Sequence, residues 1–333
     1  MSHLQRQPTR RTQTGFTLIE LMISLVLGLL VVSAAAGIFL SNQRTFRATE
    51  GLARIQENAR VAFELMARDL REAAGNPCGK NLPVANVLNG ASSGTGPWWM
   101  RWDPGLVGYE NGALGGSAAG TDALELLTSG NSPVTVAAHD QQTGNPGSPA
   151  IIKVNITHHG LRDNDIVVIC DYTQASIVQL SKAADGNVAL GFNKGSSASP
   201  GNCTKDLGVP VLCTATGYSK SYGSNSLIAK LYAARWYVAD NGRGGRSLYR
   251  VYMDKGAEQP AEEVAEQVQD MQLEYLQSGK AGYVAASAVT DWKGVVAVRI
   301  TLSMLGTTHA GEGKTQLTRT LTHIVTTLRN RTS

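Results

Sequence analysis

One segment of the chain has the composition of a phosphate-binding loop. The segment is Gly311-Glu312-Gly313-Lys314-Thr315, and in such loops the final Gly-Lys-Thr holds phosphates at the start of a helix. The full pattern also requires a glycine at the position where this chain has Thr308. Residues 317–322 alternate between apolar and polar side chains, which is typical of a strand and not of a helix. We therefore predict a hairpin turn here and no nucleotide site.

Two further groups of side chains have metal-binding chemistry but unsuitable spacing. His158 and His159 are adjacent, so on a strand they point to opposite faces, and no third ligand follows at useful spacing. Asp163-Asn164-Asp165 lacks the glycine and the distal glutamate of a calcium loop, which favours a solvated turn. The chain also has no local signature of a catalytic serine or cysteine. We predict no metal site, no cofactor, no catalytic residues and no enzymatic activity.

The four cysteines are candidates for structural disulfides. They are Cys78, Cys170, Cys203 and Cys213, and none falls in a C-x-x-C pair of the kind that binds zinc or performs thiol redox chemistry. Four cysteines allow three pairings. The most local choice joins Cys203 with Cys213 and leaves Cys78 with Cys170.

Glu20 is the most informative ionisable residue. It is the only one in the apolar run from Phe16 to Leu40, which spans roughly 37 Å as a helix against a hydrocarbon thickness of about 30 Å. A carboxylate in the middle of a membrane costs about 2.5–3.5 kcal/mol, so such residues are usually functional. We therefore expect residues 16–40 to be a transmembrane helix in which Glu20 has a specific role.

The residues before this helix indicate its orientation and the kind of signal. Arg6, Arg10 and Arg11 precede it without an acidic residue, so the N-terminus is expected in the cytoplasm and the rest of the chain outside. An ordinary secretory signal would have a shorter apolar run, with its small-residue cleavage site after that run. Here the small Gly15 lies before it. A plain membrane anchor would not need Glu20.

Gly15-Phe16-Thr17-Leu18-Ile19-Glu20, after a short basic leader, resembles the class III signal of type IV prepilins and type II secretion pseudopilins. The resemblance implies a leader of residues 1–15, cleavage between Gly15 and Phe16 by a membrane prepilin peptidase, and methylation of the new N-terminus on Phe16. It also implies that Glu20 faces the N-terminal amine of a neighbouring subunit in a filament. Opposite charges compensate each other's desolvation in such an apolar spine.

The helix is expected to continue as an amphipathic segment over residues 41–75. Apolar residues recur every three or four positions from Leu52 to Ala73, and Gly75 with Pro77 provides a stop signal. Residues 76–333 are predicted to form a β-rich domain, and the resemblance to type IV prepilins implies an α+β fold of the type IV pilin kind: a long helix packed on a large antiparallel sheet. Strands are predicted at 123–128, 134–138, 151–157, 166–170, 176–180, 227–238, 248–253, 271–276, 295–305 and 317–328.

Three local features of this domain complete the prediction. Asp240-Asn241-Gly242 is typical of a hairpin turn. Glu262–Gln267 is interpreted as one helical turn. Trp98, Trp99 and Trp102 are expected to be buried anchors of a long loop, because large aromatic side chains carry much apolar area.

The C-terminal region resembles the PilW-type minor pilins, and more distantly the type II secretion minor pseudopilin J. The resemblance rests on four segments: 247–250, 268–275, 292–300 and 327–331. It implies a minor pilin that helps start type IV pilus assembly at or near the tip, with twitching motility among the processes affected. The alternatives are a pseudopilin J-like subunit and a pilus-tip adhesin or receptor-binding module.

The expected partners and locations follow from this resemblance. They are the prepilin peptidase, other minor pilins, the major pilin, the pilus assembly platform and the inner membrane. The protein would cross the inner membrane once, with its C-terminal domain in the periplasm, and later enter the pilus. Nucleic acid is not expected as a partner, because the net charge of +4 includes the leader arginines and no basic run is interleaved with aromatic residues.

Overall fold

The computed structural model describes residues 15–79, 81–130, 134–141, 148–195, 198–213, 217–310 and 313–326. The chain divides into two compact units. One comprises Met1–Ala53 with Thr307–Thr315, and the other comprises Arg54–Gly306 with Gln316–Ser333. Apart from Gly15, the leader expected at residues 1–15 lies outside the described residues.

One long helix and fifteen strands make up the described structure. The helix is α1 (Leu18–Glu72), and short 3-10 helices occur at Trp98–Met100 and Ala286–Ala288. The strands are β1 (Val84–Asn86), β2 (Leu106–Tyr109), β3 (Ala123–Ser129), β4 (Val136–Asp140), β5 (Ala150–Val154), β6 (Ile166–Cys170), β7 (Ala175–Gln179), β8 (Ala189–Phe192), β9 (Leu227–Asp240), β10 (Arg246–Asp254), β11 (Ala257–Glu258), β12 (Glu262–Glu266), β13 (Val268–Gln277), β14 (Val295–Ala310) and β15 (Gly313–Thr326).

The strands form three sheets, and β9 is the central strand of the largest. That sheet has nine strands along the path β1-β7-β6-β9-β10-β11, with β3 also on β9, β2 on β3 and β12 on β10. The first residues of β9 pair with β6 and the remainder with β3 and β10, so this single strand links two parts of the sheet. The other sheets are β13-β14-β15 and β4-β5-β8. Among the strand pairs whose register is described, only β1 and β7 are parallel and the others are antiparallel. The α+β pilin-like fold expected from the sequence is confirmed.

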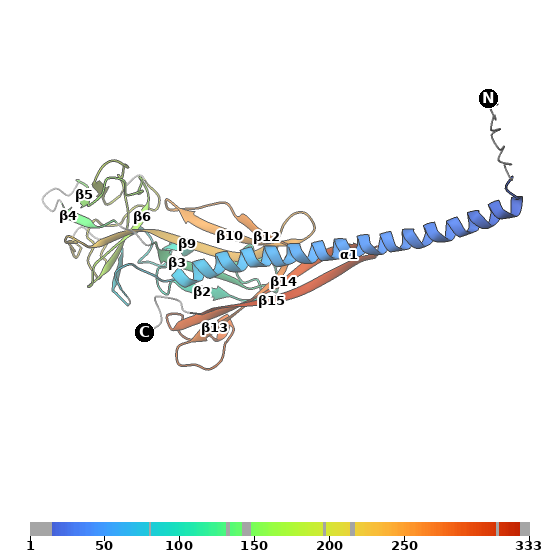
Figure 1. Ribbon diagram of the computed structural model, residues 1–333. Coiled ribbons are helices and arrows are strands. Elements are labelled where there is room, and N and C mark those ends of the chain that lie inside the picture. Colours follow the sequence, from blue (N-terminus) through green and yellow to red (C-terminus); the bar gives the residue numbers. More distant parts are fainter. Residues whose placement is uncertain are drawn as a thin grey trace, which may run out of the picture. The chain divides into compact units, whose positions relative to one another are not determined.

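The second half of α1 packs on this β-rich domain. Its buried stripe is Ile55, Ala59, Ala62, Met66, Ala67 and Leu70. These side chains share one hydrophobic core with residues of β9, β10, β13 and β14, and β9 and β10 follow this part of the helix in Figure 1. The three- and four-residue spacing places the stripe on one helix face. The amphipathic pattern of the sequence therefore predicted the face of the helix that is buried.

An ion pair fixes the end of this helix to the sheet. Oδ2 of Asp69 accepts hydrogen bonds from Trp236 Nε1 and Arg250 Nε, both at 3.0 Å, and Oδ1 accepts one from Arg250 Nη2 at 3.2 Å. The Arg250 guanidinium also lies 5.6 Å from the centre of the Trp236 ring. Burial raises the pKa of Asp69 above its ordinary value, although the Arg250 charge and both hydrogen-bonding partners oppose this shift.

Most predicted strands are present, but one predicted element is wrong. Residues 262–266 form strand β12 on β10 and not the expected helical turn. Pairing satisfies backbone groups along β10, and it places Glu263 and Glu266 against Arg243. Strands β14 and β15 are neighbours in one sheet, and β15 begins at Gly313. The hairpin turn predicted at the phosphate-loop-like segment falls on Gly311 and Glu312, which lie outside the described residues.

The expected burial of the tryptophan loop is confirmed for two of its three residues. Trp98 and Trp99 are buried in the 3-10 helix, and Trp98 Nε1 donates a hydrogen bond of 2.8 Å to Glu258 Oε2. The guanidinium of Arg235 lies 4.6 Å from the centre of the Trp98 ring. Trp102 is only half-buried.

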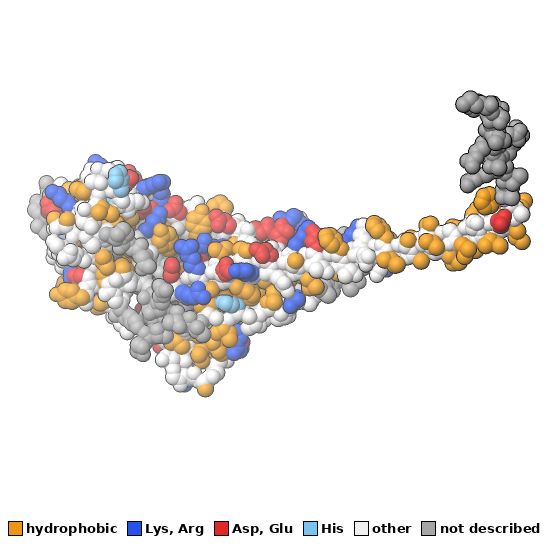
Figure 2. Space-filling model, viewed as in Figure 1, with side chains coloured by type: hydrophobic (Ala, Val, Ile, Leu, Met, Phe, Trp, Pro, Cys, Tyr) orange, Lys and Arg blue, Asp and Glu red, His pale blue; other side chains and the backbone are white. Residues whose placement is uncertain are grey.

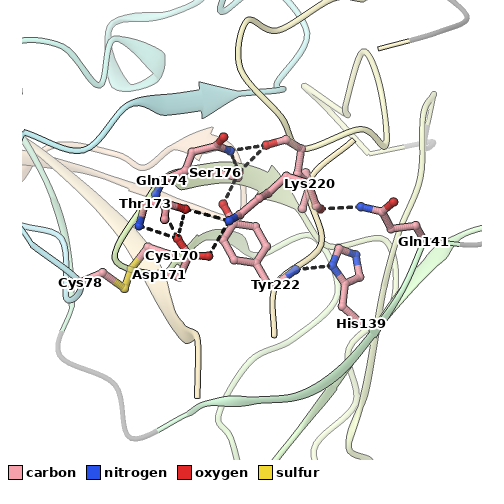
Figure 3. A network of polar contacts seen from close by, with 11 residues as sticks. Cys78, His139, Gln141, Cys170, Asp171, Thr173, Gln174, Ser176, Lys220 and Tyr222 are labelled. Carbon is pink, nitrogen blue, oxygen red and sulfur yellow. Dashed lines mark hydrogen bonds and ion pairs between the residues drawn. A yellow bond between two sulfur atoms is a disulfide. The ribbon is translucent and has the colours of Figure 1, made fainter. Parts of the chain in front are cut away.

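Both disulfides have the pairing that the sequence favoured, Cys78 with Cys170 and Cys203 with Cys213. The first is drawn beside a polar network in Figure 3, and the second closes a loop that contains Leu207. The main chain of Leu207 accepts a hydrogen bond from the Ser176 hydroxyl at 2.8 Å, and that hydroxyl lies 2.6 Å from the Tyr222 hydroxyl.

An ion pair of 2.6 Å joins Lys220 to Asp171 in the same network. Burial alone would raise the pKa of Asp171, but hydrogen bonds from Lys220, Thr173 and Gln174 lower it to about 2. Because this carboxylate stays ionised across the physiological range, the ion pair persists there.

His139 lies beside this network and gives the domain a dependence on pH. Its Nδ1 accepts the Tyr222 backbone N–H at 3.1 Å, whereas its buried Nε2 has no hydrogen-bond partner within the described structure. Burial lowers the pKa of His139 from 6.5 to about 4, with a smaller opposing effect from Asp140. The unfolded chain therefore binds this proton near pH 6.5 and the folded chain only near pH 4. The contribution of His139 to stability is fully present above pH 6.5 and is lost as pH falls toward 4.

A His139→Asn chain is expected to lose less stability than the wild type between about pH 7.5 and about pH 4.5. Denaturant midpoints at both pH values measure this difference. The matched control is His158→Asn, because His158 is exposed and its ion-pair partner among the described residues is the exposed Asp185. If His139→Asn and the wild type lose equal stability on acidification, His139 is not the group responsible.

Candidate functional site

The junction between Gly15 and Phe16 is fully accessible in the structure. Both residues precede the first helical residue, Leu18, and the Phe16 side chain is 86% exposed. No atom of the described structure apart from chain neighbours lies within 4 Å of where a side chain at Gly15 would begin. A peptidase can therefore approach this peptide bond without unfolding any described element.

Thr17 and Glu20 form a reciprocal cap at the start of α1. Oε2 of Glu20 accepts the Thr17 backbone N–H at 3.1 Å and the Thr17 hydroxyl at 3.0 Å. The Glu20 backbone N–H in turn donates to Thr17 Oγ1 at 3.4 Å. This is a capping box, in which the first and fourth residues satisfy each other's backbone donors. The T-x-x-E spacing that produces it is readable in the sequence, but our sequence analysis did not use it.

The cap determines where the carboxylate lies. Oε2 makes both hydrogen bonds, and no hydrogen bond to Oε1 occurs within the described residues. Because Oε2 is bonded to the N–H of Thr17, the carboxylate lies beside the peptide that follows Phe16. One oxygen is thus held against the helix start, and the other is available to a cation.

The first half of α1 is apolar on every side. Among the described residues, α1 is the one helix long and apolar enough to cross a membrane, with a mean hydropathy of 2.6 in its most apolar 18-residue window. Figure 2 shows hydrophobic side chains along its visible face. The hydroxyls of Ser24 and Ser33 donate to the backbone carbonyls of Glu20 and Leu29, four residues earlier. Glu20 is therefore the one charged group on an otherwise apolar surface.

The remaining candidate residues are structural. His158 is exposed, whereas His159 is buried and is hydrogen-bonded to the Asn187 carbonyl at 2.9 Å and to the Leu161 N–H at 3.0 Å. The solvated turn predicted at residues 163–165 is wrong for Asp165, which is buried and ion-paired with Lys230 at 2.9 Å. Among the described residues, no cluster of three or more histidine, cysteine or acidic side chains is placed to bind a metal ion.

The long N-terminal apolar helix followed by a sheet-rich domain fits an α+β pilin-like fold. Two family models match the chain. The prokaryotic N-terminal methylation motif matches residues 10–36, and type IV pilus-assembly protein W matches residues 235–331. Together these matches support a type IV pilus minor pilin that takes part in pilus assembly. No curated protein and no solved structure matches the chain.

The two matches cover the parts of the chain with the clearest roles. The first contains Gly15, Phe16 and Glu20, and the second contains the end of β9, from Arg235, and all of β10, β13 and β14. They suggest a structural subunit without enzymatic activity, and they imply processing by a prepilin peptidase and interaction with the pilus machinery. The apolar helix and the motif fit a membrane-anchored pilin.

Proposed function

We propose that the chain is made as a prepilin and cleaved between Gly15 and Phe16, with methylation of Phe16. The observation that carries the proposal is the methylation motif at residues 10–36, placed at the head of an exposed apolar helix. The accessible Gly15–Phe16 junction supports it. Removing the leader takes away Arg6, Arg10 and Arg11 and creates a new amine beside the Thr17–Glu20 cap.

In the assembled filament, Glu20 forms an ion pair with the Phe16 amine of a neighbouring subunit. The free Oε1 atom and the apolar surroundings of Glu20 support this role. An isolated carboxylate and an isolated amine each lose several kcal/mol on desolvation, and pairing recovers much of this loss. The same pairing fixes the axial position of one helix against the next.

The protein crosses the inner membrane once through residues 16–40, with the amphipathic residues 41–75 and the domain of residues 76–333 on the periplasmic side. It then joins other minor pilins at or near the pilus tip, where it helps the assembly platform start polymerising the major pilin. The match of residues 235–331 to type IV pilus-assembly protein W supports this assembly role.

Deleting the gene tests this role against that of a type II secretion pseudopilin. We expect surface pili and twitching motility to be strongly reduced and protein export to remain normal. The wild-type gene should restore both the pili and the motility. Blocked export with normal pili would instead identify a pseudopilin J-like subunit.

A further inference from the structure

Two arginines follow the apolar half of α1. Arg44 and Arg47 lie shortly after Leu40, the last residue of the apolar run, and they are the only ionisable residues between Glu20 and Glu50. Both side chains are exposed. Their spacing of three residues places them on the same face of the helix. This part of α1 therefore presents two positive charges side by side on an otherwise uncharged surface.

Neither arginine has a partner among the residues that the structure describes. No hydrogen bond or ion pair joins Arg44 or Arg47 to any of them. The neighbouring hydroxyls of Thr45 and Thr49 donate instead to backbone carbonyls four residues earlier. Residues 307–315, which belong to the same compact unit, contain one acidic residue and one lysine, so they leave the balance of charge unchanged. Both guanidinium groups are thus available to an external anion.

The position of the two arginines matches the depth of lipid headgroups. Residues 16–40 are long enough to fill the hydrocarbon layer of a membrane, and the headgroup region adds roughly 5–7 Å on each side. Along a helix, Arg44 lies about 6 Å beyond Leu40 and Arg47 about 10 Å beyond it. An arginine side chain can also bend back toward the interface. Lipid phosphates are therefore within reach of both guanidinium groups.

Phe46 indicates the same depth independently of charge. Its side chain is 70% exposed, and that of Phe39, seven residues earlier on the same helix face, is 66% exposed. A large aromatic side chain is unfavourable in water, but it can enter the boundary between lipid headgroups and acyl chains. Phe46 thus extends an apolar face from the expected membrane-spanning residues to the level of the two arginines.

We propose that Arg44 and Arg47 bind the phosphate groups of anionic phospholipids in the periplasmic leaflet. This inference rests on the proposed membrane crossing of residues 16–40. A guanidinium group donates two parallel hydrogen bonds to a phosphate, and its charge attracts an anionic lipid more strongly than a zwitterionic one. The two contacts would hold the helix at a fixed depth until the subunit leaves the membrane for the filament.

Native mass spectrometry of the full-length protein in neutral detergent measures the dissociation constants for phosphatidylglycerol and phosphatidylcholine. We expect phosphatidylglycerol to bind at least tenfold more tightly at low salt, because each arginine near an anionic surface contributes roughly fivefold. High salt should reduce this preference by screening. Replacing both residues, Arg44→Gln with Arg47→Gln, should remove it. Inorganic phosphate at the concentration of the lipid should leave the lipid bound.

The matched control replaces Arg68→Gln with Arg71→Gln. These two arginines have the same spacing on α1, are exposed and have no ion-pair partner in the described part of the chain, but they lie in the half of the helix that packs on the β-rich domain. The control should keep the lipid preference of the wild type.

Alkaline extraction of bacterial membranes tests the membrane crossing separately. Release of the chain into the soluble fraction would contradict both the membrane crossing and the lipid site. Three results with a chain that stays embedded would overturn the lipid site alone: equal binding of the two lipids, displacement of the lipid by inorganic phosphate, or the same lipid preference in the Arg44→Gln, Arg47→Gln chain and the control.

Discussion

A Glu20→Ala chain is expected to be cleaved and methylated normally but to be recovered in sheared filaments at least tenfold less than the wild type. In the proposed ion pair, alanine would leave the Phe16 amine of the neighbouring subunit without an opposite charge in an apolar spine. Tenfold corresponds to about 1.4 kcal/mol, which is modest for an uncompensated buried charge. Quantitative immunoblots of the membrane and sheared-pilus fractions, with mass spectrometry of the membrane-bound form, measure both steps.

Two further variants separate charge from helix capping. Glu20→Gln keeps the capping box, because glutamine can also reach back to the Thr17 N–H. It is expected to fail in incorporation as Glu20→Ala does. Thr17→Ala removes the cap at a cost of about 1 kcal/mol in helix stability and keeps the charge, so it should be incorporated almost normally. Normal recovery of Glu20→Gln in filaments would show that capping, and not charge, is what Glu20 contributes.

An Asp69→Ala chain is expected to be destabilised by about 3 kcal/mol, the lower end of the cost of removing one partner of a buried ion pair, because this pair is only partly buried. The Asp69 side chain is 15% exposed, and its loss leaves Arg250 and the Trp236 indole N–H without their hydrogen-bond acceptor. Denaturant unfolding of the full-length protein in detergent, followed by tryptophan fluorescence, measures the change. The matched control is Glu64→Ala, which breaks a pair with Arg60 in which both side chains are mostly exposed. It should leave the free energy of unfolding almost unchanged, because exposed ion pairs contribute little.

The raised pKa of Asp69 indicates that its partners do not fully offset the cost of burial. Replacing both members of the ion pair with apolar residues of similar size, Asp69→Leu with Arg250→Met, should therefore recover most of the stability that Asp69→Ala loses. A double variant as unstable as Asp69→Ala would show that the ion pair itself stabilises the helix on the sheet.

The sequence predicted the features that depend on local pattern. The uninterrupted run after Phe16 predicted the first half of α1, and the spacing from Leu52 to Ala73 predicted the buried face of the second half. The turn predicted at Asp240-Asn241-Gly242 between β9 and β10 is confirmed. It was predictable because asparagine and glycine favour the backbone conformation of a tight turn.

Features that depend on distant partners were not predictable in this way. Residues 262–266 have a helix-forming composition, but β10 recruits them as a strand. Asp165 follows Asp163 and Asn164, polar residues that are typical of a turn. Its burial depends on an ion pair with Lys230, which is distant in the sequence. Asp69 looks like any polar residue beside an apolar stripe until Trp236 and Arg250 are placed opposite it.

Mass spectrometry of the mature protein, isolated from membranes and from sheared pili, tests the central claim most directly. We expect an N-terminal peptide that begins at Phe16 and carries one methyl group on its amine. A chain that retains Met1, or one that has been cut near Ala36 as a secretory protein would be, would contradict it.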